Sequence, residues 1–290
     1  LEICLVDVDD GHPHSLRSAR VEREIQSAAG IIRLDDAGAG PAIVGLHGLS
    51  ATRRYVLMGS SALERSGHRV ILYDARGHGS SDPPPDGDYS YRALAGDLLA
   101  LFDALELERA VLVGASMGAH TALRFALENP ARVEALVLVT PGYDPDRFEA
   151  ALAHWDALST ALRERGVDGF LEAYDFERVP SAWRSTVATV IRQRLSLHVH
   201  PLAVADALAA VPRSRPFDSL TQLAAIRAPT LVVASRDEAD PEHPLALAER
   251  YAGSVAGSLM IVEDEGRSPI AWQGGQLSRA VEQLAGGLAQ

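Results

Sequence analysis

The sequence has little cysteine, no long apolar run and few basic residues. Its single cysteine, Cys4, excludes an internal disulfide framework and is compatible with a reducing cytoplasm. No apolar run approaches the roughly 20 residues that a membrane-spanning helix needs. The amino end also lacks the basic segment and the apolar segment that together make a secretory signal. These absences lead us to expect a cytoplasmic protein.

Basic residues are outnumbered, with 27 Lys and Arg against 39 Asp and Glu, a formal net charge of −12. Nucleic acids and anionic membranes are bound by clustered Lys and Arg, so neither is expected as a partner. A chain of 290 residues with 47% hydrophobic content can bury a large core carrying an insertion. We expect a small-molecule substrate and leave a homo-oligomer open.

The most informative stretch is Ala110 to Leu123, AVLVGASMGAHTAL. Its apolar run, tight turn and alanine-rich continuation predict a strand, an elbow and a helix. Gly114, Ser116 and Gly118 form G-x-S-x-G, in which a serine on a sharp turn needs neighbours with almost no side chain. Such an elbow exposes the Ser116 hydroxyl, and the helix N-terminus directs the Met117 N–H at any oxyanion formed there.

A second candidate oxyanion donor follows the apolar segment 41–46, in the sequence Leu46-His47-Gly48-Leu49. A glycine directly after a buried strand lets the backbone turn, so that the N–H of Leu49 can face the serine elbow. Alone, this segment would be an ordinary strand-end turn. The elbow and the turn together favour an oxyanion hole made by Met117 and Leu49.

The rest of the chain alternates short apolar runs with amphipathic stretches. Runs 31–36 and 41–46 predict a hairpin leading into a core strand, and Leu94, Leu98 and Leu101 lie on one helical stripe. Strands and helices at this spacing predict a parallel sheet covered on both faces. The further predicted elements are strands at 68–75, 110–115, 133–139, 230–234 and 259–262 and helices at 89–107 and 276–288.

The strand pattern stops after residue 142 and resumes near residue 228. Between them the pattern is helical, at 145–165, 167–175, 181–197, 201–211 and 217–226. We expect a helical cap, 143–227, between two parts of a core domain, 1–142 and 228–290, with 1–24 as an amino-terminal extension. Of six aromatic residues in the cap we expect one or two to reach a ligand: Phe148, Trp155, Phe170, Tyr174, Phe176 and Trp183.

Over residues 28–288 the chain resembles the α/β-hydrolase superfamily, of the capped esterase and lactonase type. The resemblance rests on four motifs that appear in the family's order: His47-Gly48, Arg76-Gly77-His78-Gly79, Gly114-x-Ser116-x-Gly118 and Asp240-Pro241-x-His243-Pro244. It implies an α/β-hydrolase fold with a mostly parallel eight-stranded sheet and a helical cap, and neither cofactor nor metal. It also implies a catalytic triad in the chain order Ser, Asp, His.

For two triad members the resemblance supplies candidates. Ser116 matches the nucleophile, and Asp240 matches the acid best, with Asp237 as the alternative. The family's histidine follows the last strand, where this chain has Gly266-Arg267-Ser268-Pro269, so Arg267 occupies its place. A guanidinium cannot accept the serine proton. Arg267 could instead pair with the acid or bind a substrate carboxylate.

Other histidines could supply the missing base. His120 lies four residues after Ser116 on the same helical face, and His198 and His200 lie in the cap. His243 follows the acid by only three residues, a position that is structural in the family. Substitution of the base by one of these histidines is plausible but is not the expectation.

Two functions therefore remain open. The first is a serine hydrolase of small esters, lactones or thioesters, weak or atypical because its triad histidine is missing. The second is a non-hydrolytic protein that binds a small molecule or catalyses a base-free reaction on the same fold, with Arg267 anchoring an anion. Fold alone does not separate them, because function depends on the site. We predict the first function. If residue 267 occupies the place of the missing histidine, Arg267→His should raise esterase turnover tenfold or more.

Overall fold

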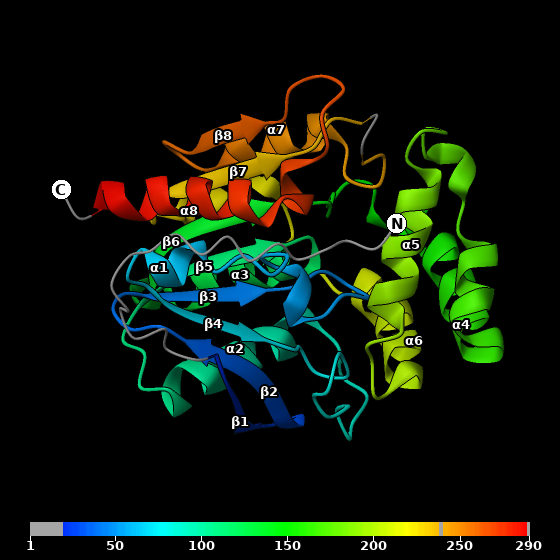
Figure 1. The fold of residues 1–290 in the computed structure, drawn as a ribbon, viewed down its shortest axis with the longest axis horizontal. Helices are drawn as coiled ribbons and strands as arrows, with labels where there is room; N and C mark the ends of the chain where they lie inside the picture. The colour runs from blue at the N-terminus through cyan, green and yellow to red at the C-terminus, as the bar shows by residue number, and fades with distance from the viewer. Residues whose placement is uncertain (1–19, 238–239, 289–290) are drawn as a thin grey trace, which may run out of the picture.

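The computed structural model describes residues 20–237 and 240–288. Its centre is one eight-stranded sheet in the order β1-β2-β4-β3-β5-β6-β7-β8 (Figure 1). All neighbouring strands from β4 to β8 pair in parallel, and β2 pairs antiparallel with both β1 and β4. The strands are β1 Val21–Ser27, β2 Gly30–Ala37, β3 Ala42–Leu46, β4 Arg69–Tyr73, β5 Ala110–Ala115, β6 Val133–Val139, β7 Thr230–Ala234 and β8 Leu259–Val262. The predicted fold class is confirmed.

The amino-terminal hairpin differs from the predicted one. Segment 31–36 lies in β2, which turns back on β1 with Ser27 opposite Gly30, whereas β3 runs beside β4 and β5. The expected extension 1–24 therefore ends inside a sheet strand, because Val21 to Glu24 pair with β2. The alternation in 21–27 is weak because this edge strand is largely exposed, which hid it in the sequence. Cys4 lies outside the described residues.

Helices cover both faces of the sheet because successive strand side chains point to opposite sides. One core layer joins Leu112 and Leu136 to helices α2, α3 and α7, and the other joins Val113 and Val137 to α1 and α8. The helices are α1 Ala62–Arg65, α2 Tyr91–Ala104, α3 Met117–Glu128, α7 Leu245–Ser254 and α8 Gly274–Leu288. Of the described helices, none has the length and apolarity required to cross a membrane.

Between β6 and β7, all of which is described, the chain forms helices and no strand. Of these helices, α4, α5 and α6 lie beyond the ends of the sheet arrows, at the carboxyl edge of the parallel strands (Figure 1). They are η3 Phe148–Ala151, α4 Leu152–Ala173, η4 Phe176–Arg178, α5 Arg184–Leu195, α6 Pro201–Ala210, η5 Val211–Arg213 and η6 Leu220–Ala225. Helices α4, α5 and α6 share a core of their own, in which Leu158, Phe170 and Leu208 are buried, whereas η5 and η6 pack on the core of the sheet through Val211 and Leu223.

Two details of this helical segment differ from the prediction. The expected helices 145–165 and 167–175 do meet at a break, because Gly166 within α4 has a φ of +64° and a ψ of −153°, which are not helical, but the first of them begins later, at Leu152 after the 3₁₀ turn η3. Gly166 therefore breaks the helix, as the sequence predicts, since glycine adopts this positive φ without steric cost. The expected helix 217–226 is the short 3₁₀ helix η6.

Candidate active site

Ser116 occupies a strained turn between β5 and α3, as the pentapeptide predicts. Its φ of 48° and ψ of −111° are unusual for a residue with a side chain, and its N–H donates to the Val139 carbonyl at 2.9 Å. A Cβ on Gly114 would overlap the backbone of Gly118, and one on Gly118 would overlap the carbonyl of Leu46. Such backbone strain costs about 1–3 kcal/mol and is concentrated at functional sites.

The side chain in contact with Ser116 is that of His243. Its Nε2 lies 2.9 Å from Ser116 Oγ, and its Nδ1 lies 3.0 and 2.9 Å from the two carboxylate oxygens of Asp240. A carboxylate only accepts hydrogen bonds, so Nδ1–H donates to Asp240 and Nε2 is free to accept the Ser116 hydroxyl proton. Hydrogen bonds thus connect Ser116 to His243 and His243 to Asp240, which is the arrangement of a catalytic triad.

The pKa values of Asp240 and His243 are shifted in opposite directions by their contact. Burial raises the pKa of Asp240, but the charge and hydrogen bond of His243, helped by the Glu242 N–H and Arg194, outweigh burial and hold the pKa below its ordinary value. For His243, burial lowers the pKa, and the Asp240 charge and hydrogen bond outweigh it, so the pKa lies above its ordinary value. Asp240 is therefore placed to stabilise an imidazolium on His243.

The loop after β7 brings His243 to Ser116 because the loop after β6 leaves room for it. A Cβ built on Gly142 would lie 2.7 Å from His243 Cδ2. The neighbouring backbone is held by His120, whose Nε2 accepts from the N–H groups of Gly142 and Tyr143 at 3.0 Å each. A residue without a side chain at position 142 is thus required for this placement of the imidazole.

The two expected oxyanion donors, Met117 and Leu49, both line the cavity beside Ser116. The N–H of Met117 opens α3, where it has no intrahelical partner. No described residue accepts a backbone hydrogen bond from the N–H of Leu49. A tight turn, with Ala51 N–H donating to Gly48 O at 3.0 Å, shapes the loop that carries Leu49. Both groups are therefore available to a ligand oxygen.

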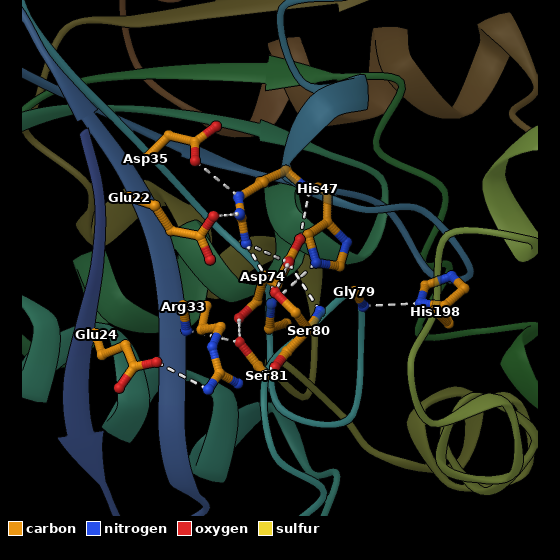
Figure 2. A network of polar contacts seen from close by, with 12 residues as sticks. Glu22, Glu24, Arg33, Asp35, His47, Asp74, Gly79, Ser80, Ser81 and His198 are labelled. Atoms are coloured by element: carbon orange, nitrogen blue, oxygen red, sulfur yellow. Dashed lines mark hydrogen bonds and ion pairs between the residues drawn. The ribbon is translucent and has the colours of Figure 1, made fainter. Parts of the chain in front are cut away.

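Two buried histidines hold that loop. His47 Nδ1–H donates to Gly48 O at 2.8 Å, and its Nε2 accepts from Ala75 N–H at 2.9 Å. His198, between α5 and α6, donates from Nε2 to Ser50 O at 3.1 Å and accepts from Gly79 N–H at 2.7 Å. Figure 2 shows His198 reaching from the helical segment to Gly79. Burial lowers the pKa of His47 to about 4 and also lowers the pKa of His198, so these contacts are made by neutral rings.

Among the described residues, the rings of the other histidines considered as substitute bases do not hydrogen-bond to the Ser116 hydroxyl. His120 faces Tyr91 with Nδ1, 3.0 Å from the hydroxyl, and burial lowers its pKa to about 3. His198 uses both ring nitrogens on backbone groups, and His200 precedes α6 as its N-cap. The ring that the sequence pattern marked as structural, His243, is the one that meets Ser116.

Arg267 does not occupy the position beside the acid. Its side chain is exposed, its backbone N–H donates to Asp264 O at 3.1 Å, and no described carboxylate pairs with it. Both oxygens of Asp240 face His243 instead. The alternative acid, Asp237, accepts the N–H of Leu245 at 2.8 Å and so caps α7. The expected pairing of Arg267 with Asp240 or Asp237 is therefore absent.

A cavity of about 330 Å³ opens at Ser116. Four of the six aromatic residues of the helical segment line it: Phe148, Trp155, Phe170 and Tyr174. The core side contributes Tyr55 and Trp272, so most of the wall is apolar. Among the described residues no three His, Cys, Asp or Glu side chains cluster to hold a metal ion.

Comparison with known proteins places this fold and site in a family. Residues 41–252 match the family model described as the alpha/beta hydrolase fold. The chain belongs to the α/β-hydrolase family. A protein of Variovorax paradoxus assigned as the carbamate hydrolase RutD is 34% identical over 201 residues, which are 69% of this chain and 75% of that protein.

Two solved structures resemble this hydrolase over nearly its full length. A hydrolase from Pseudomonas aeruginosa is 28% identical with a TM-score of 0.73, covering 92% of this chain and 99% of that one. A thermophilic esterase from Thermogutta terrifontis is 26% identical with a TM-score of 0.74, covering 93% and 100%. Because the related proteins are named as hydrolases, this chain is an α/β-fold hydrolase.

Sequence reasoning missed His243 because it sought the histidine after β8. The chain order Ser116, Asp240, His243 still follows the expected Ser, Asp, His order. The available signal was the three-residue spacing of Asp240 and His243, which lets one turn present both side chains on the same side. The reach of the His243 ring to an elbow 127 residues earlier cannot be obtained from spacing.

Proposed function

We propose that this protein is a serine hydrolase of small ester, lactone or thioester substrates, with Ser116 as nucleophile, His243 as base and Asp240 as acid. The observation that carries the proposal is the 2.9 Å contact of His243 Nε2 with Ser116 Oγ, with Asp240 behind the ring. The names of the relatives, carbamate hydrolase and esterase, support attack on a carbonyl bonded to oxygen or nitrogen.

In the proposed reaction, Ser116 Oγ attacks the substrate carbonyl carbon while His243 Nε2 takes the hydroxyl proton. The carbonyl oxygen becomes an oxyanion, which the N–H groups of Met117 and Leu49 stabilise. Collapse of this intermediate breaks the bond to the leaving group, and His243 returns the proton to the departing oxygen or sulfur. The product of this half-reaction is an acyl-serine at residue 116.

Water then completes the cycle. His243 removes a proton from a water molecule as that water attacks the acyl carbon, and the second oxyanion uses the same two N–H groups. Collapse releases the carboxylic acid and returns the proton to Ser116 Oγ. Throughout, Asp240 holds the Nδ1–H tautomer and stabilises the imidazolium, for which its lowered pKa keeps it ionised.

This proposal replaces the expectation of weak activity. That expectation rested on a missing base, and His243 supplies one at hydrogen-bond distance from the nucleophile. The alternative of a non-hydrolytic binding protein has no observation in its favour once this contact is present. We further propose that the helices of residues 143–227 act as the cap of the site, since four of their aromatic side chains line the cavity.

Labelling by a fluorophosphonate tests the proposal directly. The wild-type protein is expected to gain one phosphonyl group within minutes, since an activated serine attacks phosphorus by the same proton transfer. Intact-mass spectrometry measures the adduct, and Ser116→Ala should abolish it. If the folded wild-type protein gains no adduct, Ser116 is not an activated nucleophile and the proposal fails.

Gly142→Ala tests the placement of His243. The added methyl group would stand 2.7 Å from the imidazole Cδ2, so the ring must shift away from Ser116. We expect kcat to fall about 100-fold, the effect of misplacing a catalytic group by about 1 Å. Steady-state hydrolysis of 4-nitrophenyl butyrate measures it.

The control for Gly142→Ala is Gly96→Ala, in α2. A Cβ at Gly96 meets nothing within 4 Å, and alanine suits a helix interior. Its activity should match the wild type. Full activity in Gly142→Ala, with neither variant unfolding at a lower temperature than the wild type, would contradict the tight packing of His243 against residue 142.

A further inference from the structure

Arg194 stands out in the cavity because no role in the proposed reaction uses it. It lies on α5 with Val187, Val190 and Ile191, a stripe of residues that all line the cavity. Its Nε is buried and has no hydrogen-bond partner. No described carboxylate lies within ion-pair distance of its guanidinium, although many surface arginines of this chain are paired.

The carboxylates that share the cavity wall are already matched by other cations. Asp144 pairs with Arg250 at 2.8 Å, and Glu242 pairs with Arg178 at 2.9 Å. Both oxygens of Asp240 are within 3.0 Å of His243 Nδ1. Among the described residues that line the cavity, Arg194 is therefore the one permanently charged cation without an anion.

The groups nearest in electrostatic terms do not neutralise Arg194. The charge of Arg194 acts on the hydroxyls of Tyr174 and Tyr55, and burial raises the pKa of both, so they remain uncharged. The charge of Asp240 also acts on Arg194, but this carboxylate is hydrogen-bonded to His243 and forms no ion pair with the guanidinium. Burial also lowers the pKa of Arg194, which is the sign of a desolvated cation. Leaving a cation desolvated and unpaired is costly, and the cost is recovered when an anion enters.

We propose that Arg194 is a substrate anchor, so that the preferred substrate is an ester or lactone carrying a carboxylate remote from the bond that is cleaved. This inference rests on the proposed function, because it places the carbonyl at Ser116 and the carboxylate at Arg194 in the same cavity. Guanidinium N–H groups bind a carboxylate by two parallel hydrogen bonds. Tyr55 and Tyr174 line the same cavity and carry hydroxyls of the kind that donates to a carboxylate.

Two esters of similar length measure this preference: 4-nitrophenyl hydrogen glutarate, an anion, and 4-nitrophenyl pentanoate, which is neutral. In Arg194→Met we expect kcat/KM for the anionic ester to fall about 30-fold, mostly through KM, because charged hydrogen bonds are lost. The neutral ester should change less than about threefold. Arg194→Lys keeps the charge without the two-pronged geometry and should lie between the wild type and Arg194→Met.

Arg192→Met is the matched control. Arg192 is on the same helix, is exposed and pairs with Asp168 at 2.7 Å. Its replacement by methionine therefore removes the same charge from a position outside the cavity. It should leave both esters unchanged. Equal losses on both esters in Arg194→Met would overturn the proposal, because Arg194 would then act through Asp240. Unchanged rates on both esters would overturn it as well.

A binding measurement separates this inference from the proposed function. Isothermal titration of 4-nitrophenyl hydrogen glutarate into Ser116→Ala, which cannot form the acyl-enzyme, should show binding about 30-fold tighter than in Ser116→Ala with Arg194→Met. That difference would support the anchor even if wild-type protein hydrolysed neither ester. Equal affinities in the two variants would overturn the anchor even if Ser116 proved to be the nucleophile.

Discussion

Replacement of His243 by alanine should lower kcat for 4-nitrophenyl butyrate by about 10⁵- to 10⁶-fold, the loss that follows removal of the base in a serine hydrolase. The alanine leaves Ser116 without an acceptor for its proton, since His243 Nε2 is the ring nitrogen within 2.9 Å of Oγ. Oxyanion stabilisation and binding remain, so a rate above that in water should persist. Steady-state release of 4-nitrophenol measures the loss, and circular dichroism confirms folding.

Arg267→His is the control that shows whether the base lies in the loop after β7, with His243, or in the loop after β8, with residue 267. If His243 is the base, a histidine in the exposed segment after β8 changes kcat by less than about twofold, in place of the tenfold rise predicted from the sequence. His243→Ala that retains most of the wild-type rate would contradict the assignment. So would a tenfold gain in Arg267→His, which would show that residue 267 reaches Ser116.

Asp240→Asn should lower kcat by about 10⁴-fold, the effect of this change on a triad whose geometry is kept. An amide in place of the carboxylate can donate to His243 Nδ1, which then moves the ring proton to Nε2, where it blocks acceptance from Ser116. The same assay measures kcat, and thermal unfolding shows whether the loop between β7 and α7 is kept.

The pH profile of Asp240→Asn gives a second, independent readout. The base must be neutral to accept a proton, so the rate falls as the pH drops through the pKa of His243. In the wild type, Asp240 raises that pKa against the effect of burial. Without the charge, burial dominates and the pKa falls, so the acidic limb of kcat/KM should move to lower pH while the maximum falls. An acidic limb that stayed in place would mean that Asp240 does not act on the base.

Asp237→Asn is the matched control, since Asp237 was the alternative acid. Its carboxylate accepts the N–H of Leu245 at the start of α7, so its loss should cost stability of about 1 kcal/mol or less with little change in kcat. Chemical denaturation measures the first and the ester assay the second. A loss in Asp237→Asn as large as that in Asp240→Asn would identify residue 237 as the acid.

Sequence patterns predicted correctly those elements that depend on a few neighbouring residues. The elbow at Ser116 was predictable because a strained turn excludes side chains at Gly114 and Gly118, where a Cβ would overlap the backbone. The parallel strands followed from apolar runs that are buried on both faces. The prediction paired residues 31–36 with the wrong segment because β1, the actual partner of β2, is an exposed edge strand without an apolar run.

Only the tertiary structure brings the proposed base, His243, to Ser116. The sequence alone predicted the family, a strained elbow at Ser116, two candidate oxyanion donors and two candidate acids, because each depends on a few adjacent residues. Whether His243 or residue 267 meets Ser116 depends on the path of the β7–α7 loop and on the space left by Gly142. Likewise, only the packed structure shows Arg194 without a described carboxylate partner. Both are contacts between segments far apart in the chain, and no local pattern encodes such distances.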